Sequence, residues 1–179
     1  MKIGTLFTKK IWTLFDAFRQ DVSAISDGIQ QFLEVHEELA ACASDPELVR
    51  QLRRHLKQTE QQAMNLDRIA ELLSAQDLPV TNHAARGIAR EVRDAVDATQ
   101  TNHVRDWIIT TAADTILRAE ITRYLALLAM ARQLELPYQV VDLLQQNLGQ
   151  DEQALHDLAQ LAPRVLQAAV QWQGGREQE

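Results

Sequence analysis

The sequence predicts an all-α protein folded as one four-helix bundle, in which two helical hairpins are joined by a long crossover. Apolar residues recur at helical spacing through two long segments, around residues 11–75 and 102–170. Only 6 Gly and 4 Pro occur in the 179-residue chain, which leaves room for long uninterrupted helices. A polar segment separates the two hairpins, and an up-and-down bundle with short loops would not need it.

The first helix is predicted from Ile11 to about Ala41, because apolar side chains line one side and polar side chains the other. Its stripe consists of Phe15, Phe18, Val22, Ile25, Ile29, Phe32, Leu33 and His36. Ser44 and Glu47 have the spacing of a capping box, and Pro46 suits the first turn of a helix. We therefore expect a second helix to begin here and to form a tight antiparallel hairpin with the first.

The second helix is expected to end near Ser74, before a polar crossover. Its apolar stripe consists of Leu48, Leu52, His55, Leu56, Thr59, Ala63, Leu66, Ile69, Leu72 and Leu73. The crossover contains a weaker helical pattern from about His83 to Val96, whose charged side chains are typical of a solvated face. This short helix is predicted to cover one side of the bundle.

The second hairpin is predicted to contain a helix from about His103 to Leu134 and another from near Pro137 to about Trp172. Thr101 or Asn102 suits the N-cap of the first of these helices. Leu136 and Pro137 make the turn between them. The apolar residues of both helices again recur every three or four positions, which is the pattern of bundle helices.

The fourth bundle helix contains Gly149 and Pro163, which predict bends because Gly weakens a helix and Pro interrupts its hydrogen bonds. The length of the chain suits one domain. We assign residues 1–173 to this domain, with residues 1–10 as an N-terminal extension of the first helix. Residues 174–179 are expected to be a disordered tail.

The composition indicates a folded protein and argues against several classes of partner. Hydrophobic residues make up 46% of the chain and charged residues 24%. The net charge is −7 and the basic residues are scattered, so nucleic acid is not expected as a partner. The lone Cys42 excludes an intrachain disulfide. No segment approaches the roughly 18 apolar residues of a transmembrane helix, and residues 1–18 lack the apolar run of a signal peptide. A cytoplasmic location is expected.

The chain resembles the YciE/YciF-type ferritin-like family of bacterial stress-associated proteins over nearly all of residues 15–165. Two short-loop hairpins joined by one long connection are also the connectivity of ferritin-like bundles. The residues that carry the resemblance are Ser44-Asp45-Pro46-Glu47-Leu48, His55-Leu56, Thr59, Leu66, Val104-Arg105-Asp106, Glu120-Ile121, Tyr124 and Ala131-Arg132-Gln133-Leu134. The resemblance implies a four-helix bundle with a buried cluster of carboxylates and histidines suited to two iron or manganese ions.

This chain departs from the ligand pattern that the resemblance implies. A glutamate is expected where Ser26 stands, and an acid beside His55-Leu56, where the chain has Lys57-Gln58. The run Glu-His-Tyr-Glu of the family reads Leu117-Arg118-Ala119-Glu120. The acidic pair of the last helix reads Asp151 and Leu155. A di-metal centre would therefore lack ligands and its histidine.

The remaining candidates for metal ligands are Glu120 with Asp151, and Glu60. Iron or manganese would be the cofactor if they bind one, and otherwise no cofactor is expected. A structural interpretation of Glu120 is that of a partly buried acid paired with a neighbour, which would be Arg118, Arg123 or Tyr124. The histidines lack the spacing of a metal site in the sequence, and His55 is expected to be a packing residue of its helix.

The N-terminal segment concentrates aromatic residues. Phe7, Ile11, Leu14 and Phe18 follow a spacing of four, three and four residues, with Trp12 and Phe15 beside them. We expect this face to pack on the bundle or across a dimer interface. Attachment to a membrane surface is the other interpretation, although two lysines on an acidic protein give weak attraction.

Three functions fit the sequence. We favour a non-enzymatic bundle that acts through protein–protein contacts, as a homo-oligomer such as a dimer or with an unidentified partner, because the packing pattern is retained without the metal chemistry. The second is a di-iron or di-manganese oxidase or peroxidase that uses Glu60, Glu120 and Asp151, with Tyr124 nearby. The third is a bundle that binds an apolar ligand or a peptide helix in a groove.

Overall fold

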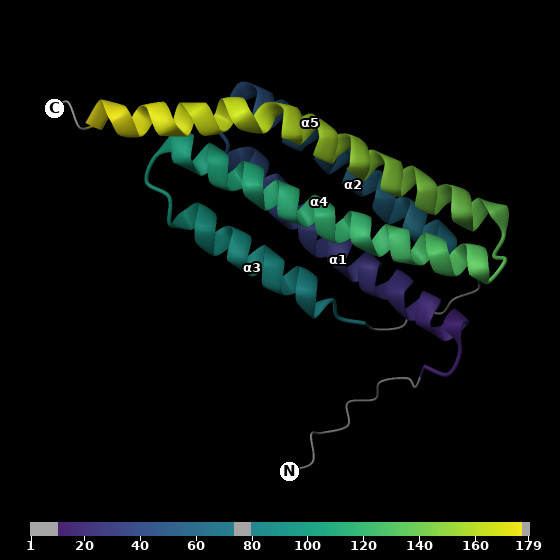
Figure 1. Ribbon diagram of the computed structural model, residues 1–179. Coiled ribbons are helices and arrows are strands. Elements are labelled where there is room, and N and C mark those ends of the chain that lie inside the picture. The colour runs from purple at the N-terminus through teal and green to yellow at the C-terminus, as the bar shows by residue number, and fades with distance from the viewer. Residues whose placement is uncertain (1–10, 74–79, 177–179) are drawn as a thin grey trace, which may run out of the picture.

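The computed structural model describes residues 11–73 and 80–176, with side chains as far as Trp172, and this part of the chain contains helices and no strand. The helices are α1 (Leu14–Cys42), α2 (Pro46–Leu72), α3 (His83–Asp97), α4 (Asn102–Gln133) and α5 (Tyr138–Arg176). They confirm the predicted all-α class (Figure 1). The expected N-terminal extension, residues 1–10, and residues 177–179 lie outside the described residues.

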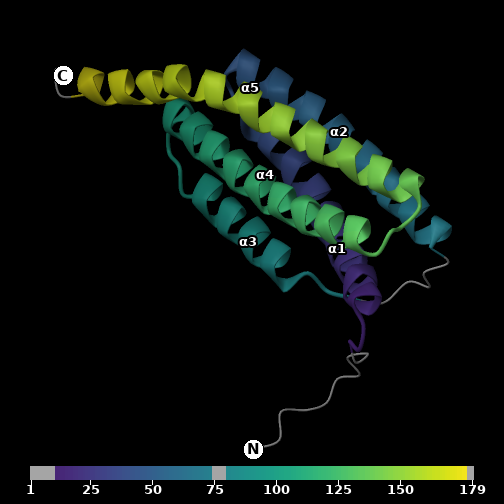
Figure 2. The same ribbon diagram turned by 45° about the vertical axis from the view of Figure 1, so that its right-hand side comes forward.

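The four long helices form a bundle in which each helix has two neighbours. α1 packs against α2 and α4, and α5 packs against the same two helices, so α2 and α4 lie diagonally across the bundle. α3 lies outside, against α1 and α4, within the connection that carries the chain from α2 to α4 (Figures 1 and 2). This arrangement is the predicted ferritin-like bundle of two hairpins with one long crossover. None of the helices in the described residues is long and apolar enough to cross a membrane.

The start of α2 differs from the prediction by one residue. Asp45, rather than Ser44, is the N-cap, and its carboxylate accepts hydrogen bonds from the N–H groups of Glu47 and Leu48. Ser44 instead turns toward α4, where its hydroxyl and its N–H both donate to Asp106, at 2.6 and 2.7 Å. The N–H of Asp45 donates to the same carboxylate at 3.0 Å. The turn between α1 and α2 is therefore fastened to the first turn of α4.

α1 begins at Leu14 rather than Ile11, because Thr13 and Asp16 form a capping box that the sequence analysis did not identify. Phe18 is fully buried, whereas Leu14 and Ile11 remain half exposed. Phe7 lies outside the described residues. Of the residues of the aromatic N-terminal face that the structure describes, only some pack on this bundle.

α3 is attached to α1 by polar contacts at two levels. Asn82, the N-cap of α3, donates from its side chain to the carbonyl of Ala24, and its N–H donates to Asp27 at 2.8 Å. A Cβ atom on Gly28 would lie 2.7 Å from the side-chain nitrogen of Asn82, so only glycine permits this approach. Further along α3, the guanidinium of Arg93 donates two hydrogen bonds to Glu38.

α5 is one helix through both Gly149 and Pro163, although Pro163 removes a hydrogen-bond donor from its interior. Figures 1 and 2 show α5 changing direction in its C-terminal half, the half that contains Pro163, and extending past the end of the bundle. The helix continues to Arg176, and therefore includes three residues of the segment that the sequence analysis assigned to a disordered tail from residue 174.

The interior contains two apolar clusters. One lies toward the turn between α1 and α2 and includes Val35, Leu48, Ile109 and Leu158. The other lies toward the turn between α4 and α5 and includes Phe18, Leu66, Tyr124 and Leu144. Along α2, α4 and α5, buried polar side chains lie between the residues of the two clusters.

The three hydrogen bonds at Asp106 predict a large effect of its removal. Asp106→Ala should lower the free energy of unfolding by about 3 kcal/mol, because three hydrogen bonds to a buried carboxylate are lost. Denaturant unfolding followed by circular dichroism measures this change. Asp114→Ala on the same helix removes a surface pair with Arg118 and should cost less than about 1 kcal/mol. Equal effects of the two substitutions would contradict this interpretation.

Candidate functional site: a polar layer inside the bundle

A layer of polar side chains crosses the middle of the bundle, and each of the four long helices contributes to it. The layer separates the two apolar clusters, and its members are nearly or fully inaccessible to solvent. They are His36 on α1, His55, Thr59, Gln62 and Asn65 on α2, Glu120 on α4, and Asn147 and Asp151 on α5. Polar groups at this depth are costly unless they have partners, so their contacts indicate what the layer can do.

His36, His55 and Glu120 come together at one end of the layer. The two imidazole rings meet edge to face, with centroids 4.6 Å apart and planes at 85°. Nε2 of His55 lies 4.0 Å from Oε2 of Glu120. The three residues are 0%, 5% and 2% exposed, respectively, and come from α1, α2 and α4. They form a compact donor set in the interior, which we call the His–His–Glu group.

The polar atoms of the His–His–Glu group have no hydrogen-bond partner within the described part of the chain. No hydrogen bond of standard geometry is made within the described residues by either ring nitrogen of His36, either ring nitrogen of His55 or either carboxyl oxygen of Glu120. The amide of Gln58 lies near His55 and partly opposes the lowering of its pKa. Native interiors leave few such atoms unpaired, and each needs an explanation such as a water molecule or an ion. Six of them in one group distinguish this end of the layer from the rest of the interior.

Burial sets the charge of this group. Desolvation lowers the pKa of His36 well below its usual value, with a smaller contribution from His55, and it lowers the pKa of His55 to about 4. Desolvation raises the pKa of Glu120 well above its usual value, and the nearby charge of Asp151 adds to this effect. Both imidazoles are therefore neutral at neutral pH, and the contact between His55 and Glu120 is not an ion pair.

The other end of the layer is a hydrogen-bonded network between α2, α4 and α5. Gln62 donates to Asp151 at 2.6 Å, and Asn65 donates to the side-chain oxygen of Asn147 at 2.7 Å. The hydroxyl of Tyr124 donates to Gln62 and accepts from Asn147. These side chains satisfy one another almost completely, with Oδ2 of Asp151 as the exception. This end of the layer is occupied by protein groups alone.

Two cavities approach the layer from different sides. One lies between α2, α4 and α5, has a volume of about 40 Å³, and includes His55 in its lining. The ion pair between Arg54 and Asp157, at 3.2 Å, lies at this cavity. The other cavity lies between α1, α3 and α4, has a similar volume, and includes Glu120 in its lining. The His–His–Glu group therefore borders space on two sides of the bundle.

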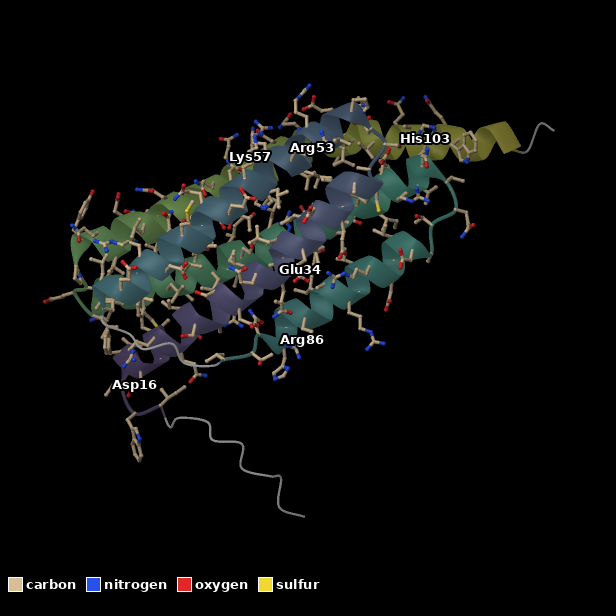
Figure 3. The ribbon with its side chains drawn as sticks, turned by 180° about the vertical axis from the view of Figure 1, so that it is seen from behind. Asp16, Glu34, Arg53, Lys57, Arg86 and His103 are labelled. Atoms are coloured by element: carbon tan, nitrogen blue, oxygen red, sulfur yellow. The ribbon has the colours of Figure 1, made fainter. Side chains whose placement is uncertain are left out.

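The structure brings together two of the three predicted ligand candidates. Glu120 and Asp151 are both buried in the layer. Glu60 is exposed and lines a hollow on the outside of α1 and α2, together with Arg53 and Lys57, which lie on the outer surface of α2 in Figure 3. Glu60 therefore does not point toward the other two acids.

The expected pairing of Glu120 with a neighbour on its own helix is wrong. Arg118 is exposed and binds Asp114, and the guanidinium of Arg123 lies 3.7 Å from Asp21. The hydroxyl of Tyr124 donates to Gln62 instead (Oη–Oε1 3.3 Å). Within the described residues, Glu120 is a buried acid that makes no hydrogen bond, because these side chains are engaged elsewhere and His55 lies 4.0 Å away.

Sequence reasoning missed His36 as a site residue and assigned His55 to packing alone. Each histidine continues an apolar stripe, which hides it in a single-helix pattern. The predicted hairpin could have indicated that the two histidines meet. They lie at comparable distances along the chain on either side of the α1–α2 turn, and an antiparallel pair of helices brings such positions together. No comparable signal pairs Gln62 with Asn147.

The residues present do not fit a pair of metal ions. The hydroxyl of Ser26 donates to the carbonyl of Val22, Lys57 is exposed, and Leu117 is buried in the apolar core. Glu120 and Asp151 are the carboxylates of the layer in the described residues, whereas two adjacent divalent ions take about four carboxylates with two histidines.

The charge state of Asp151 predicts a pH-dependent stability. Burial raises its pKa from 3.8 to about 7, so the folded state is penalised progressively as the pH rises from about 4 to about 7. Asp151→Asn keeps an acceptor for Gln62 but cannot ionise. Relative to wild type, it should gain at least about 1 kcal/mol in unfolding free energy between these pH values, measured by denaturant titration at each pH.

The opposite effect of the buried histidines is common to both proteins and cancels in this comparison. Asp157→Asn on the same helix disrupts a pair with Arg54 at the surface and should change the unfolding free energy by no more than about 1 kcal/mol at either pH. A difference between wild type and Asp151→Asn that does not vary with pH would show that folding does not raise the pKa of Asp151.

Comparison with known proteins gives consistent matches. Protein YciF of Escherichia coli (strain K12) is 27% identical over 125 residues, which is 68% of this chain and 74% of YciF. The crystal structure of the E. coli stress protein YciF superimposes with a TM-score of 0.83 at 24% identity, over 88% of this chain and 99% of that one. YcfI from Rhodopseudomonas palustris, whose description suggests a structural role, matches with a TM-score of 0.81 at 25% identity, over 86% and 98%.

The two structural matches share the fold described above, and the predicted similarity to YciF-type proteins is confirmed. One family matches residues 13–171, which extend from the N-cap of α1 almost to the end of α5. The chain therefore belongs to the family described as Domain of unknown function (DUF892).

Proposed function

We propose that the protein is a non-enzymatic ferritin-like bundle that acts through protein–protein contacts, as a homo-oligomer such as a dimer. The observation that supports this most is an interior that is well packed but lacks the ligand set of a di-metal centre. Gln62, Asn65 and Asn147 form a satisfied network, and Leu117 is part of the apolar core. The fold is thus retained without the ligand set that dinuclear chemistry requires.

The surface of α5 offers a place for such contacts. Leu166 is 40% exposed and Val170 is 59% exposed, and the spacing of four residues puts them on one face of the helix. The buried residues Leu161, Val165 and Ala169 hold the opposite face against the protein. Leu166 and Val170 lie in the C-terminal half of α5, and their exposed face is open to a second copy of the chain.

The names of the relatives support the biological setting of the proposal. YciF is described as a stress protein, and a structural role is suggested for YcfI. We extend the stress-related setting and the structural role to this chain, and propose that it is a bacterial protein of the cytoplasm. In that compartment the single exposed Cys42 would stay reduced. A further, unidentified protein partner is compatible with the same exposed face of α5.

A metal-dependent oxidase or peroxidase is the second candidate, and one observation favours it. Glu120 and Asp151 are buried acids with unpaired oxygens in the middle of the bundle. This function would require close to two iron or manganese ions per chain after anaerobic loading and desalting, together with a new near-ultraviolet absorption on exposure to oxygen.

The proposed homo-oligomer predicts the effect of a charge on α5. Val170→Glu should shift the protein from a dimer to a monomer, because an ionised side chain cannot be buried in an apolar contact without a partner. Size-exclusion chromatography with light scattering measures the molar mass across a concentration series. The dissociation constant should rise at least about tenfold, which corresponds to about 1.4 kcal/mol.

Gln167→Glu is the matched control, because it adds the same charge at an exposed polar position of the same helix. It should leave the molar mass unchanged. A wild-type protein that is monomeric at all accessible concentrations would contradict the homo-oligomer. Equal dissociation of both variants would show that Val170 is not specifically buried in the interface.

A further inference from the structure

We propose that His36, His55 and Glu120 form a binding site for a single divalent transition-metal ion of the zinc class. This site shares Glu120 with the dinuclear candidate, but it uses two histidines in place of Glu60 and Asp151 and holds one ion. It is independent of the protein–protein contacts proposed above, because it lies in the interior.

The geometry of the group fits one ion. Each residue offers one ligand atom, and the three atoms all lie within 4.8 Å of one another. Zinc bonds to imidazole nitrogen and to carboxylate oxygen are about 2.0–2.2 Å long. Two ligand atoms of one zinc ion therefore lie closer together than 4.8 Å. To bind a shared ion, the three atoms would need to approach one another by about 1 Å. Small side-chain rotations on three separate helices supply such a movement.

The chemistry of the donors also selects the class of ion. Two imidazoles and one carboxylate form a ligand set that suits zinc and ferrous iron, whereas calcium and magnesium prefer sites made of oxygen ligands. Burial keeps both rings in the neutral form, which is the form that binds a metal. Three protein ligands leave a further position on the ion for water.

The unpaired atoms of the group are the second, independent observation. Six buried nitrogen and oxygen atoms of these three residues have no partner in the described part of the chain. The neighbouring network shows that this bundle otherwise pairs its buried polar groups, as Gln62 and Asn147 do. An ion that binds one atom of each residue would satisfy half of them directly.

Asp151 lies outside the proposed site. Its Oδ1 accepts the short hydrogen bond from Gln62, and it does not belong to the group of ligand atoms that lie within 4.8 Å. A second ion beside the first would therefore find no free pair of carboxylates. The site is mononuclear for this reason.

The cavity between α2, α4 and α5 provides the access route. It reaches His55, and its volume of about 40 Å³ is enough for one water molecule. Apolar side chains such as Leu52 and Leu158 line its inner part, and the Arg54–Asp157 pair lies at its outer part. An ion could pass here with a small local opening, and a water molecule here could complete its coordination.

The test is a titration of the full chain with Co²⁺ and Zn²⁺ after removal of metal with a chelator. One equivalent of Co²⁺ per chain should produce visible absorption bands, which one equivalent of Zn²⁺ should remove. Isothermal calorimetry with Zn²⁺ gives the affinity. His36→Gln and His55→Gln should each weaken Zn²⁺ binding by more than about 100-fold, which is beyond the 10–100-fold loss from removing an outer-shell partner.

Glu60→Gln is the matched control, since Glu60 is an acid on the same helix as His55 but is exposed, and its affinity should stay within twofold of wild type. Glu120→Gln, which is nearly isosteric, gives the same test if a histidine variant does not fold. Absence of stoichiometric binding to wild type, or unchanged affinity in the folded variants, would overturn the site and leave water as the occupant. Two equivalents of Co²⁺ would also overturn it.

Discussion

The bundle depends on how it accommodates a polar layer in the middle of an apolar interior. Two apolar clusters supply most of the favourable burial, and between them the chain places imidazoles, carboxyl groups and amides. Burying an unpaired amide or acid costs more than a typical hydrogen bond gains, so the layer tolerates only those arrangements of the helices that keep its partners together. The network of Gln62, Tyr124, Asn147 and Asp151 thus determines how α2, α4 and α5 are aligned along their lengths.

The two ends of the layer differ in how their buried polar atoms are paired. Amide side chains are both donors and acceptors, so Gln62 and Asn147 can satisfy several neighbours without any other molecule. The polar atoms of the two histidines and Glu120 make no hydrogen bond of standard geometry within the described residues. One end of the layer therefore stabilises the alignment of the helices, and the other end has polar atoms available to bind a cation. The proposals for protein contacts and for a single cation rest on these two different ends.

Much of the fold could be predicted from the sequence because the signals of each helix lie within its own segment of the chain. Apolar periodicity, the proline at position 46 and the polar crossover identified both hairpins and the short third helix within a few residues. The N-cap of α2 was misplaced because Ser44 and Asp45 both suit the position, and only the contact of Ser44 with Asp106 on α4 decides between them. That contact joins residues far apart in the chain, so no local pattern contains it.

The candidate site was less accessible to prediction, because it depends on the rotation and alignment of helices relative to one another. Glu60 stands only five positions after His55, yet it points to solvent while His55 points inward. The acids Glu120 and Asp151 were identified from the resemblance, but their environment of neutral imidazoles and amides was not. Such environments arise from all four long helices at once, and a single sequence shows each helix separately.

The attachment of α3 has a consequence for the dynamics of the interior. α3 buries mainly small side chains, namely Ala85, Ala89, Val92 and Val96, and its polar contacts with α1 include Asn82 at its start and a half-exposed ion pair from Arg93. An element with so little buried apolar area opens at a lower free energy than the bundle that supports it. Because α3 forms one wall of the cavity beside Glu120, the rate at which solvent protons reach that carboxyl group would follow the detachment of α3. The Glu120 side of the layer would then exchange with solvent without unfolding of the four helices around it.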